Sequence, residues 1–514
     1  MKKNPALYAA LFCLCLCACP VTEPPEPIKI QGRIRLSNEL VTAKYEAVNV
    51  NIYDKNGEIM SSVTVSPIGS PAPSMPQYSW EATFIIPAAA APVTIFAELD
   101  LNGDRFYSEG TDAIVASGSN YDLYVSEAYT PLFKKEELKA IGKTAAYPLN
   151  GKYILIKNLD LSDGVWAPIG TEGNPFSGIF SGGFNTISGL RLPGGSNRYI
   201  GLFGYVLGTG AAHAGIKNLK VNIASSSISL NSGSSEQNLG IICGYAENAY
   251  FENIIASGTA AGLKITKANG FAGVSAGGIA GRIVSSATSP TTTFIDGGTR
   301  ISGCASLLSL TLNADTVGNT ETTYLGGIVG TTYTNGTGAL LITIQKSYST
   351  GTINLKNTTG NAAAGGINAY SFCGSGSENA RIIECYSSGD ITCKGIRLLC
   401  GGILGSNRDS SKNTISYSVS LNDTFGVLST GVAHVGKISG EAVTPTRNYN
   451  LEESTIITDA TGTPTIETTS GDDIPRSNVT ELWFMTFAGS PNNWDFNSTW
   501  KWDSDSLRPV FVWQ

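Results

Sequence analysis

The sequence is poor in charge and in side chains suited to acid–base or metal chemistry. Charged residues make up 15% of its 514 positions, and it has two histidines, His213 and His434, neither within a Cys/His spacing typical of metal sites. Acidic residues outnumber basic ones by 41 to 34, giving a net charge of −7. We therefore expect no nucleic-acid partner, no resident cofactor and no catalytic residues that sequence can name.

Long hydrophobic runs are also scarce. One apolar run, residues 6–17, follows Lys2 and Lys3 and is too short to cross a bilayer. It is typical of a secretion signal, which we assign to residues 1–18. The proline-rich stretch 19–27 that follows predicts a stiff, extended spacer.

The end of this signal, Leu16-Cys17-Ala18-Cys19, resembles the bacterial lipobox. The resemblance implies that Cys19 becomes the lipidated first residue, so that buried acyl chains hold the mature protein to a membrane. We then expect an outer-membrane or cell-surface location. Ordinary cleavage that leaves Cys19 free is the alternative.

Helical periodicity is absent from residues 201–440, and a recurring glycine phrase takes its place. Its closing positions are 204, 244, 281, 330, 369 and 405, spaced by 40, 37, 49, 39 and 36 residues, within the range of solenoid repeats. The glycines that define it are Gly201, Gly204, Gly244, Gly278, Gly281, Gly327, Gly330, Gly366, Gly402 and Gly405. We expect tight corners at these positions.

Short strands with apolar and polar alternation separate the glycine phrases and predict a parallel β-helix of about three strands per coil. Residues one repeat apart then stack in columns about 4.8 Å apart. Two interior columns are expected, listed here in chain order: Leu219, Ile254, Cys304, Ser347, Cys385 and Ser418; and Phe203, Ile242, Ala280, Val329, Asn368 and Leu404. Asn368-Ala369 departs from the apolar-Gly ending, so a bulge is expected in the fifth coil.

Six cysteines follow Cys19: Cys243, Cys304, Cys373, Cys385, Cys393 and Cys400. An even number in an exported chain raises the question of disulfides. Cys304 and Cys385 are two coils apart in one column, about 9.6 Å by strand spacing, and too far apart to pair. We expect them to fill the interior as small apolar groups, whereas Cys393 and Cys400 could close a loop.

Residues 28–130 show strand alternation without the glycine repeat, which predicts a separate β-sandwich of immunoglobulin or transthyretin type. Within it, oxygen-bearing side chains recur as in calcium loops. The candidate ligands are Asp100, Asn102, Asp104, Ser108 and Asp112. Because the spacing departs from the EF-hand pattern, a plain Asn-Gly turn with a solvated acidic tail is the alternative.

Residues 131–514 resemble bacterial surface proteins that carry the GLUG motif. The resemblance rests on an amphipathic segment 133–141, a Trp166-Ala-Pro-Ile-Gly170 turn, the ordered Gly-Leu-x-Gly phrases and an aromatic ending such as Trp494-Asp-Phe496. It implies a right-handed parallel β-helix with an N-terminal helical cap and an aromatic C-terminal cap at 480–514. The family has no shared catalytic residues to carry over.

These features together predict an all-β protein that binds and does not catalyse. We expect a monomeric, lipid-anchored, adhesin-like protein whose β-helix loops recognise a protein or glycan on host or neighbouring cells. The loops near 284–300, 313–323, 331–339 and 356–364 are the expected contact segments. The alternatives are a carbohydrate-active β-helix enzyme, for which carboxylates are sparse, and a purely structural envelope component.

Overall fold

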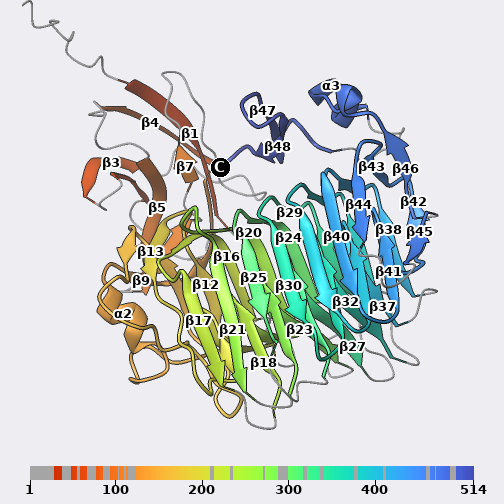
Figure 1. Cartoon of the computed structure of the whole chain (residues 1–514). Coiled ribbons are helices and arrows are strands. Elements are labelled where there is room, and N and C mark those ends of the chain that lie inside the picture. Colours follow the sequence, from red (N-terminus) through yellow and green to blue (C-terminus); the bar gives the residue numbers. More distant parts are fainter. Residues whose placement is uncertain are drawn as a thin grey trace, which may run out of the picture.

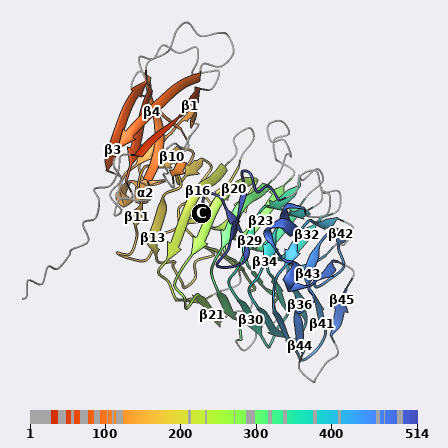
Figure 2. The same cartoon turned by 90° about the horizontal axis from the view of Figure 1, so that it is seen from above.

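The computed structural model describes residues 28–36, 48–54, 58–65, 77–84, 93–101, 104–108, 111–113, 123–208, 214–231, 235–269, 272–286, 299–315, 321–335, 341–374, 380–408, 412–458, 464–468, 470–486 and 494–514. It consists of a small N-terminal β-sandwich (red to orange) and a long right-handed parallel β-helix that runs from yellow to blue (Figures 1 and 2). The predicted fold class is confirmed.

The sandwich is one sheet folded over a single core. Its strands are β1 (Ile28–Leu36), β2 (Val48–Tyr53), β3 (Ile59–Val65), β4 (Gln77–Phe84), β5 (Val93–Leu101), β6 (Asp104–Ser108), β7 (Thr111–Ala113) and β8 (Leu123–Ala128). They pair in the order β3-β2-β5-β6-β8-β1-β4, with β7 on β5, and the end strands β3 and β4 lie beside one another. Alternate residues such as Ile30, Val50 and Leu99 point inward and are fully buried, as the period-two pattern predicts.

A full coil of the β-helix passes through four sheets, which we number in the order in which the coil from β16 to β19 meets them. Sheet 1 contains β9 (Thr130–Leu132), β10 (Lys152–Leu155), β11 (Leu159–Asp160), β12 (Ile179–Ser181), β13 (Thr186–Leu190), β16 (Ala214–Ile223), β20 (Ala249–Ser257), β24 (Thr299–Ser306), β28 (Ile342–Gln345), β29 (Tyr348–Ser349), β33 (Ala380–Ile383), β34 (Tyr386–Ser387), β38 (Asn413–Ser416), β39 (Val419–Ser420), β42 (Thr444–Thr446), β43 (Tyr449–Leu451) and β46 (Asp472–Ile474).

The other three sheets are regular stacks of parallel strands. Sheet 2 contains β17 (Ser227–Asn231), β21 (Leu263–Asn269), β25 (Leu310–Asn313), β30 (Ile353–Asn357), β35 (Ile391–Gly395), β40 (Thr424–Ser429) and β44 (Thr455–Thr458). Sheet 3 contains β14 (Tyr199–Ile200), β18 (Gln237–Gly240), β22 (Val274–Gly277), β26 (Thr323–Gly326), β31 (Ala362–Gly365), β36 (Leu398–Gly401), β41 (Ala433–Gly436) and β45 (Thr465–Glu467). Sheet 4 contains β15 (Phe203–Leu207), β19 (Cys243–Glu247), β23 (Ala280–Ser286), β27 (Val329–Asn335), β32 (Asn368–Cys373) and β37 (Leu404–Asn407).

The expectation of three strands per coil was therefore wrong by one. The glycine phrase forms the expected tight corner, and this corner lies between two short strands, those of sheets 3 and 4. Gly278-Ile279, for example, separates β22 from β23. Because each of these strands is short and apolar, sequence periodicity alone could not divide them.

The two predicted interior columns are largely correct. Leu219 pairs with Ile254, and Ile254 with Cys304, as expected. In the second column Phe203 pairs with Cys243 and not with Ile242, so that prediction was one residue out of register. The expected bulge is also absent, because Val329, Asn368 and Leu404 pair without a register shift, and Asn368 Nδ2 donates to Thr332 Oγ1 over 2.9 Å inside the coil.

Sheet 1 turns in each coil at one residue in the left-handed conformation. These residues form a column: Asn218, Asn253, Gly303, Lys346, Glu384, Tyr417 and Arg447. In the early coils Asn253 Nδ2 donates to Asn218 Oδ1 over 3.0 Å, which is the local bonding that makes asparagine suitable there. The bulkier members of the column adopt a strained conformation that the stacked coils impose.

The predicted helix at the N-terminal end is present as α2 (Lys135–Ala140). The Glu137 carboxylate accepts hydrogen bonds from the backbone N–H groups of Phe133 and Lys134, at 2.7 and 3.0 Å, and so caps the helix. Leu138 on its inner face is fully buried against the first coil. The chain passes from the sandwich to the solenoid between β8 and β9, because β8 pairs with β1 and β9 with β10.

The aromatic C-terminus does not cap the end of the solenoid as expected. It contains the 3-10 helix η2 (Arg476–Asn478), α3 (Glu481–Met485), β47 (Trp500–Asp503) and β48 (Arg508–Phe511), and it runs back along the outside of sheet 1 (Figure 1). Trp513 reaches Phe184 in the first coils, at 5.3 Å between ring centroids. We call residues 480–514 the C-terminal strap, of which 480–486 and 494–514 are described.

Candidate functional site

Sheets 3 and 4 approach closely on their outer sides because the second residue of five of the six described sheet 4 strands is glycine, and that of β32 is the small Ala369. A Cβ atom at Gly244 would lie 2.5 Å from the backbone nitrogen of Ile200, and one at Gly281 would lie 2.5 Å from that of Leu239. No side chain fits at such distances. The glycine column therefore brings the outward residues of sheet 3 next to those of sheet 4, along a line that we call the tyrosine corner.

The first part of the tyrosine corner is a cluster of three tyrosines from neighbouring coils. Tyr205 and Tyr245, paired in sheet 4, stack with their ring centroids 4.5 Å apart. Tyr199 of sheet 3 meets Tyr205 edge to face at 5.1 Å. All three rings are half-buried, so each keeps part of its surface open to solvent. Such rings present an apolar face and a polar tip to a ligand.

A second cluster lies further along the same line. Tyr324 of sheet 3 meets Tyr370 of sheet 4 at 5.1 Å, and Tyr333 lies against Tyr370 and Phe372 at 6.0 and 5.1 Å. These rings too are half-buried. The midpoints of the two clusters are three coils apart, about 14 Å by strand spacing. The corner thus offers two aromatic platforms along the solenoid axis.

Three arginines lie over rings of the two clusters. The guanidinium carbons of Arg198, Arg282 and Arg408 are 5.0, 4.8 and 5.2 Å from the ring centroids of Tyr199, Tyr333 and Phe372. Such cation–π contacts hold the ring planes in place while adding donors at their edges. They make the platforms stiffer than isolated surface tyrosines.

Carboxylates partner these arginines and tyrosines within the corner. Arg198 pairs with Glu172 at 2.7 Å, and Arg282 pairs with Glu236 and also donates from Nε to Thr331 Oγ1 at 3.0 Å. The Tyr245 hydroxyl donates to Glu247 at 3.2 Å. None of these three carboxylates is therefore left as an unengaged base facing the rings.

Burial keeps the tyrosine hydroxyls protonated. Desolvation raises the pKa of Tyr199 and of Tyr370 to about 12, and it also raises the pKa values of Tyr205, Tyr245, Tyr324 and Tyr333. The rings are therefore neutral donors and acceptors at any physiological pH.

The structure places Asp100, Asp104 with Ser108, and Asp112 on the three strands β5, β6 and β7, and calcium binding stays a prediction. Leu101 pairs with Asp104, so residues 102–103 connect β5 to β6. Asp100 pairs with Arg105, whereas Asp112 pairs with Thr94, six residues before Asp100 on β5 and about 20 Å away by strand rise. The Ser108 hydroxyl is buried and accepts from the backbone of Ala97 at 2.8 Å, and Asn102 lies outside the described residues.

Other predicted site residues have simple outcomes. Cys19 and His213 lie outside the described residues, and His434 is half-buried in β41. The six later cysteines are buried free thiols, so Cys304 and Cys385 fill the interior as expected, and Cys393 and Cys400 do not close a disulfide loop. Burial raises the pKa of Cys304 and of Cys400 to about 12. Over the described part of the chain, no three His, Cys, Asp or Glu side chains could share a metal ion.

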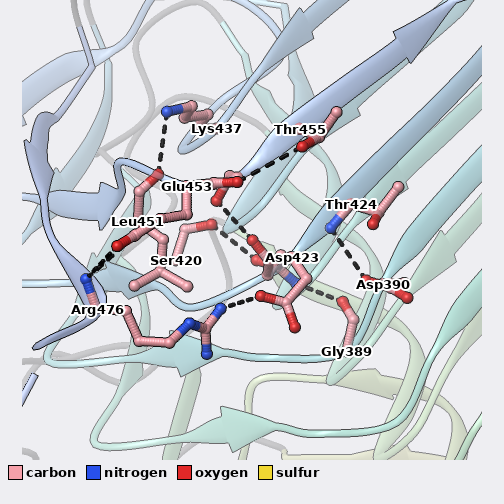
Figure 3. Close-up of polar contacts among 12 residues, drawn as sticks. Gly389, Asp390, Ser420, Asp423, Thr424, Lys437, Leu451, Glu453, Thr455 and Arg476 are labelled. Atoms are coloured by element: carbon pink, nitrogen blue, oxygen red, sulfur yellow. Dashed lines mark hydrogen bonds and ion pairs between the residues drawn. The ribbon is translucent and has the colours of Figure 1, made fainter.

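One group of carboxylates that sequence treated as scattered comes together at the far end of the solenoid (Figure 3). Asp390 accepts from the backbone of Thr424 at 3.0 Å, Asp423 pairs with the Arg476 guanidinium, and Glu453 accepts twice from the Arg476 backbone, at 2.9 and 3.0 Å. These bonds fix the turn that leads into the C-terminal strap. We assign them a structural role.

Sequence analysis missed the tyrosine corner, although a signal was present. A tyrosine directly follows the closing position of the repeat phrase three times, at Gly204-Tyr205, Gly244-Tyr245 and Ala369-Tyr370. The sheet 3 tyrosines that contact these rings, Tyr199 and Tyr324, could not be predicted, because the sequence does not show where sheet 3 ends and sheet 4 begins. The expected recognition loops are described in part, since 287–298, 316–320 and 336–340 lie outside the described residues.

Comparisons with known proteins add little. No protein-family model and no curated protein matches the chain. A crystal structure of a "putative immunoglobulin A1 protease" from Bacteroides ovatus is similar, with 15% identity and a TM-score of 0.43, covering 75% of this chain and 93% of that one. A likeness of this size carries no argument for function. Neither of the described helices α2 and α3 is long and apolar enough to cross a membrane.

Proposed function

We propose that this chain is an exported binding protein, held to the bacterial outer membrane by a lipid on Cys19, which recognises a polymer on host or neighbouring cells with its tyrosine corner. The observation that carries the proposal is the pair of half-exposed aromatic platforms on one line of a rigid solenoid. Coils stacked by hydrogen bonds hold these rings in fixed positions, which reduces the entropy lost on binding.

The rival proposal, a carbohydrate-active enzyme, needs two carboxylates that face one bond, one of them free to act as acid or base. The corner carboxylates Glu172, Glu236 and Glu247 are each engaged by an arginine or a tyrosine hydroxyl. This favours binding without turnover. A purely structural envelope role would not need rings that remain half-exposed.

The proposal is tested by protease shaving of intact cells, with a periplasmic protein as control. We expect residues 131–514 to be lost while the control stays intact, and Cys19→Ala to release the chain from the membrane fraction. Shaved cells and cells expressing Tyr245→Ala should adhere less to their target surface. If an active protease leaves the chain intact, the surface-binding proposal fails and a purely structural role in the cell envelope becomes the favoured function.

A further inference from the structure

From the balance of charge and the spacing of the rings, we infer that the tyrosine corner binds an uncharged glycan chain lying along the solenoid axis. The inference rests on the proposed function and narrows it to one class of ligand. Three features of the described residues carry it, namely charge, spacing and hydrogen-bonding capacity.

The charges at the corner cancel. Among the described residues, the charged side chains that contact the rings of the corner or pair with one another there are Arg198, Arg282, Arg397 and Arg408 and Glu172, Glu236, Glu247 and Glu441, four of each sign. Arg397 lies 3.8 Å from Glu441, and the Ser406 hydroxyl donates to the same carboxylate at 2.8 Å. Lys267 interacts electrostatically with Glu321 and with Glu236. Lys267 and Glu321 therefore add one basic and one acidic group to this set.

A charge-balanced surface gives no net attraction to a polyanion or a polycation. The tyrosines stay protonated and add no charge near neutral pH. Burial lowers the pKa of Lys267 to about 8, so its positive charge is lost as the pH rises above that value. Acidic polysaccharides, nucleic acids and strongly charged peptides are therefore poor fits. A neutral polymer needs no net electrostatic attraction to bind such a surface and meets no net repulsion there.

The spacing of the rings fits a chain with a short repeat. Within a cluster the rings follow the strand spacing, as the 4.5 Å stack of Tyr205 on Tyr245 shows. Between clusters the separation is three coils, about 14 Å. Because Tyr205 and Tyr245 stack on one another's faces, a ligand lying along the axis meets mainly ring edges and hydroxyls. A ligand that uses both platforms must be several units long and extended.

The corner also carries the polar groups that sugar hydroxyls need. Tyrosine hydroxyls and guanidinium edges line it, and β18 places Asn238 next to Tyr199 in the first cluster, on the side that faces the second. Asn238 is 2% exposed, and its Oδ1 accepts no hydrogen bond from any described residue. A hydroxyl donor is the group that this acceptor lacks.

The test is affinity gel electrophoresis of the full mature chain in soluble polysaccharides. The neutral probes are mannan, xylan, galactan, dextran and amylose; the anionic probes are polygalacturonate, hyaluronan and heparin. We expect retardation by at least one neutral glycan, unchanged from low to high salt, and none by the anionic probes. Oligosaccharides of increasing length should compete better until both clusters are spanned.

Variants locate the binding. Tyr245→Ala and Tyr370→Ala, one in each cluster, should each weaken glycan binding about tenfold, as expected for the loss of one ring contact. Tyr245→Phe, which keeps the stack, serves if the alanine variant misfolds. Tyr147→Ala is the matched control, because Tyr147 is also a half-buried ring stacked on another tyrosine, Tyr153 at 6.2 Å, but lies away from the corner.

The outcomes separate the two proposals. Salt-sensitive binding to an anionic probe, or no retardation by any neutral glycan, overturns the inference. If cell adhesion still depends on Tyr245 and Tyr370, the proposed function stands with another ligand class. If the corner variants change neither glycan binding nor adhesion, both proposals fail.

Discussion

At the scale of single residues, the fold depends most on glycines at which a side chain would collide with the backbone of a neighbouring strand. Gly281 lies between two neighbouring coils: a Cβ there would meet Leu239 N at 2.5 Å and Gly244 O at 2.6 Å. Neither atom can move without shifting a strand. The repeat phrase is therefore a steric requirement of the corner between sheets 3 and 4.

We predict that Gly281→Ala destabilises the protein by about 1–3 kcal/mol, the usual cost of overpacking a rigid site. Urea unfolding followed by circular dichroism measures the change. Gly173→Ala is the control, since a Cβ at Gly173 meets nothing within 4 Å. Equal stability of both variants would mean that the two sheets are not held as closely as described.

Glu384 is the most unusual charged residue in the solenoid. It takes the left-handed conformation, with φ of 53°, and is 5% exposed, and its Oε2 has no hydrogen-bond partner among the described residues. Desolvation raises the pKa of its carboxyl, Lys346 opposes this shift, and Asp495 of the strap adds to it. The folded protein therefore favours the protonated form.

This sets the sign of a pH dependence. Unfolded, the carboxyl titrates near its ordinary pKa of about 4.3, so the folded state binds more protons above that pH. Its contribution to stability is complete below the ordinary value and is lost as the pH rises through the raised value. We predict that Glu384→Gln removes this loss and is more stable than the parent at neutral pH.

Urea midpoints of Glu384→Gln and of the parent, measured from acidic to neutral pH, check the prediction. The difference should grow with pH. Glu136→Gln, at an exposed position of α2, should give a constant offset. A difference between Glu384→Gln and the parent that does not vary with pH would show that Glu384 titrates normally.

At the scale of elements, the C-terminal strap is held to sheet 1 by a continuous aromatic layer. Tyr348 and Tyr386, neighbours in the sheet, stack at 4.8 Å with their planes 4° apart. Trp500 and Phe511 cover them, and the Tyr386 hydroxyl donates to the Pro509 carbonyl at 2.6 Å. The strap thereby joins several coils along one flank.

We predict that Phe511→Ala loosens the strap and leaves the solenoid folded. Phe511 is fully buried, 5.0 Å from Tyr348 and 4.9 Å from Trp500, so truncation should cost about 3–5 kcal/mol of docking energy. Trypsin should then cut early at Lys501, while residues 214–458 keep their hydrogen-exchange protection. Leu507→Ala, at a side chain 65% exposed, should behave as the parent does.

The elements also show how far sequence could predict this fold. The columns at Leu219 and Phe203 were readable because stacked coils place similar residues at the same point of each repeat phrase. The error in the second column, Ile242 for Cys243, arose because the second phrase, Gly240–Gly244, is one residue longer than the others. The direction of the strap was not readable, because Trp494 and Trp500 are equally suited to cover an end or a flank. The tyrosine corner was missed since it needs the relation between two sheets, which no single strand contains.

At the scale of the whole molecule, the sandwich and the solenoid share a small apolar contact. Tyr53 and Phe96 of the sandwich pack with Tyr129 of the connection, with Ile154 of β10 and with Ile156 just after that strand. All five are at least nine-tenths buried. The sandwich therefore covers apolar surface at the first coils as well as linking them to the predicted membrane anchor.

We predict that the fragment 129–514 folds but self-associates, because removal of the sandwich exposes Ile154 and Ile156. Exposure of each isoleucine side chain costs about 1.5–3 kcal/mol. Two fragments can recover this energy by packing their exposed isoleucines against one another. Light scattering should show concentration-dependent association, and the double substitution Ile154→Thr and Ile156→Thr should restore the monomer, since threonine keeps the branched shape that a strand accepts. A fragment that stays monomeric with both isoleucines intact would mean that this contact is dispensable, leaving the sandwich as a spacer between membrane and solenoid.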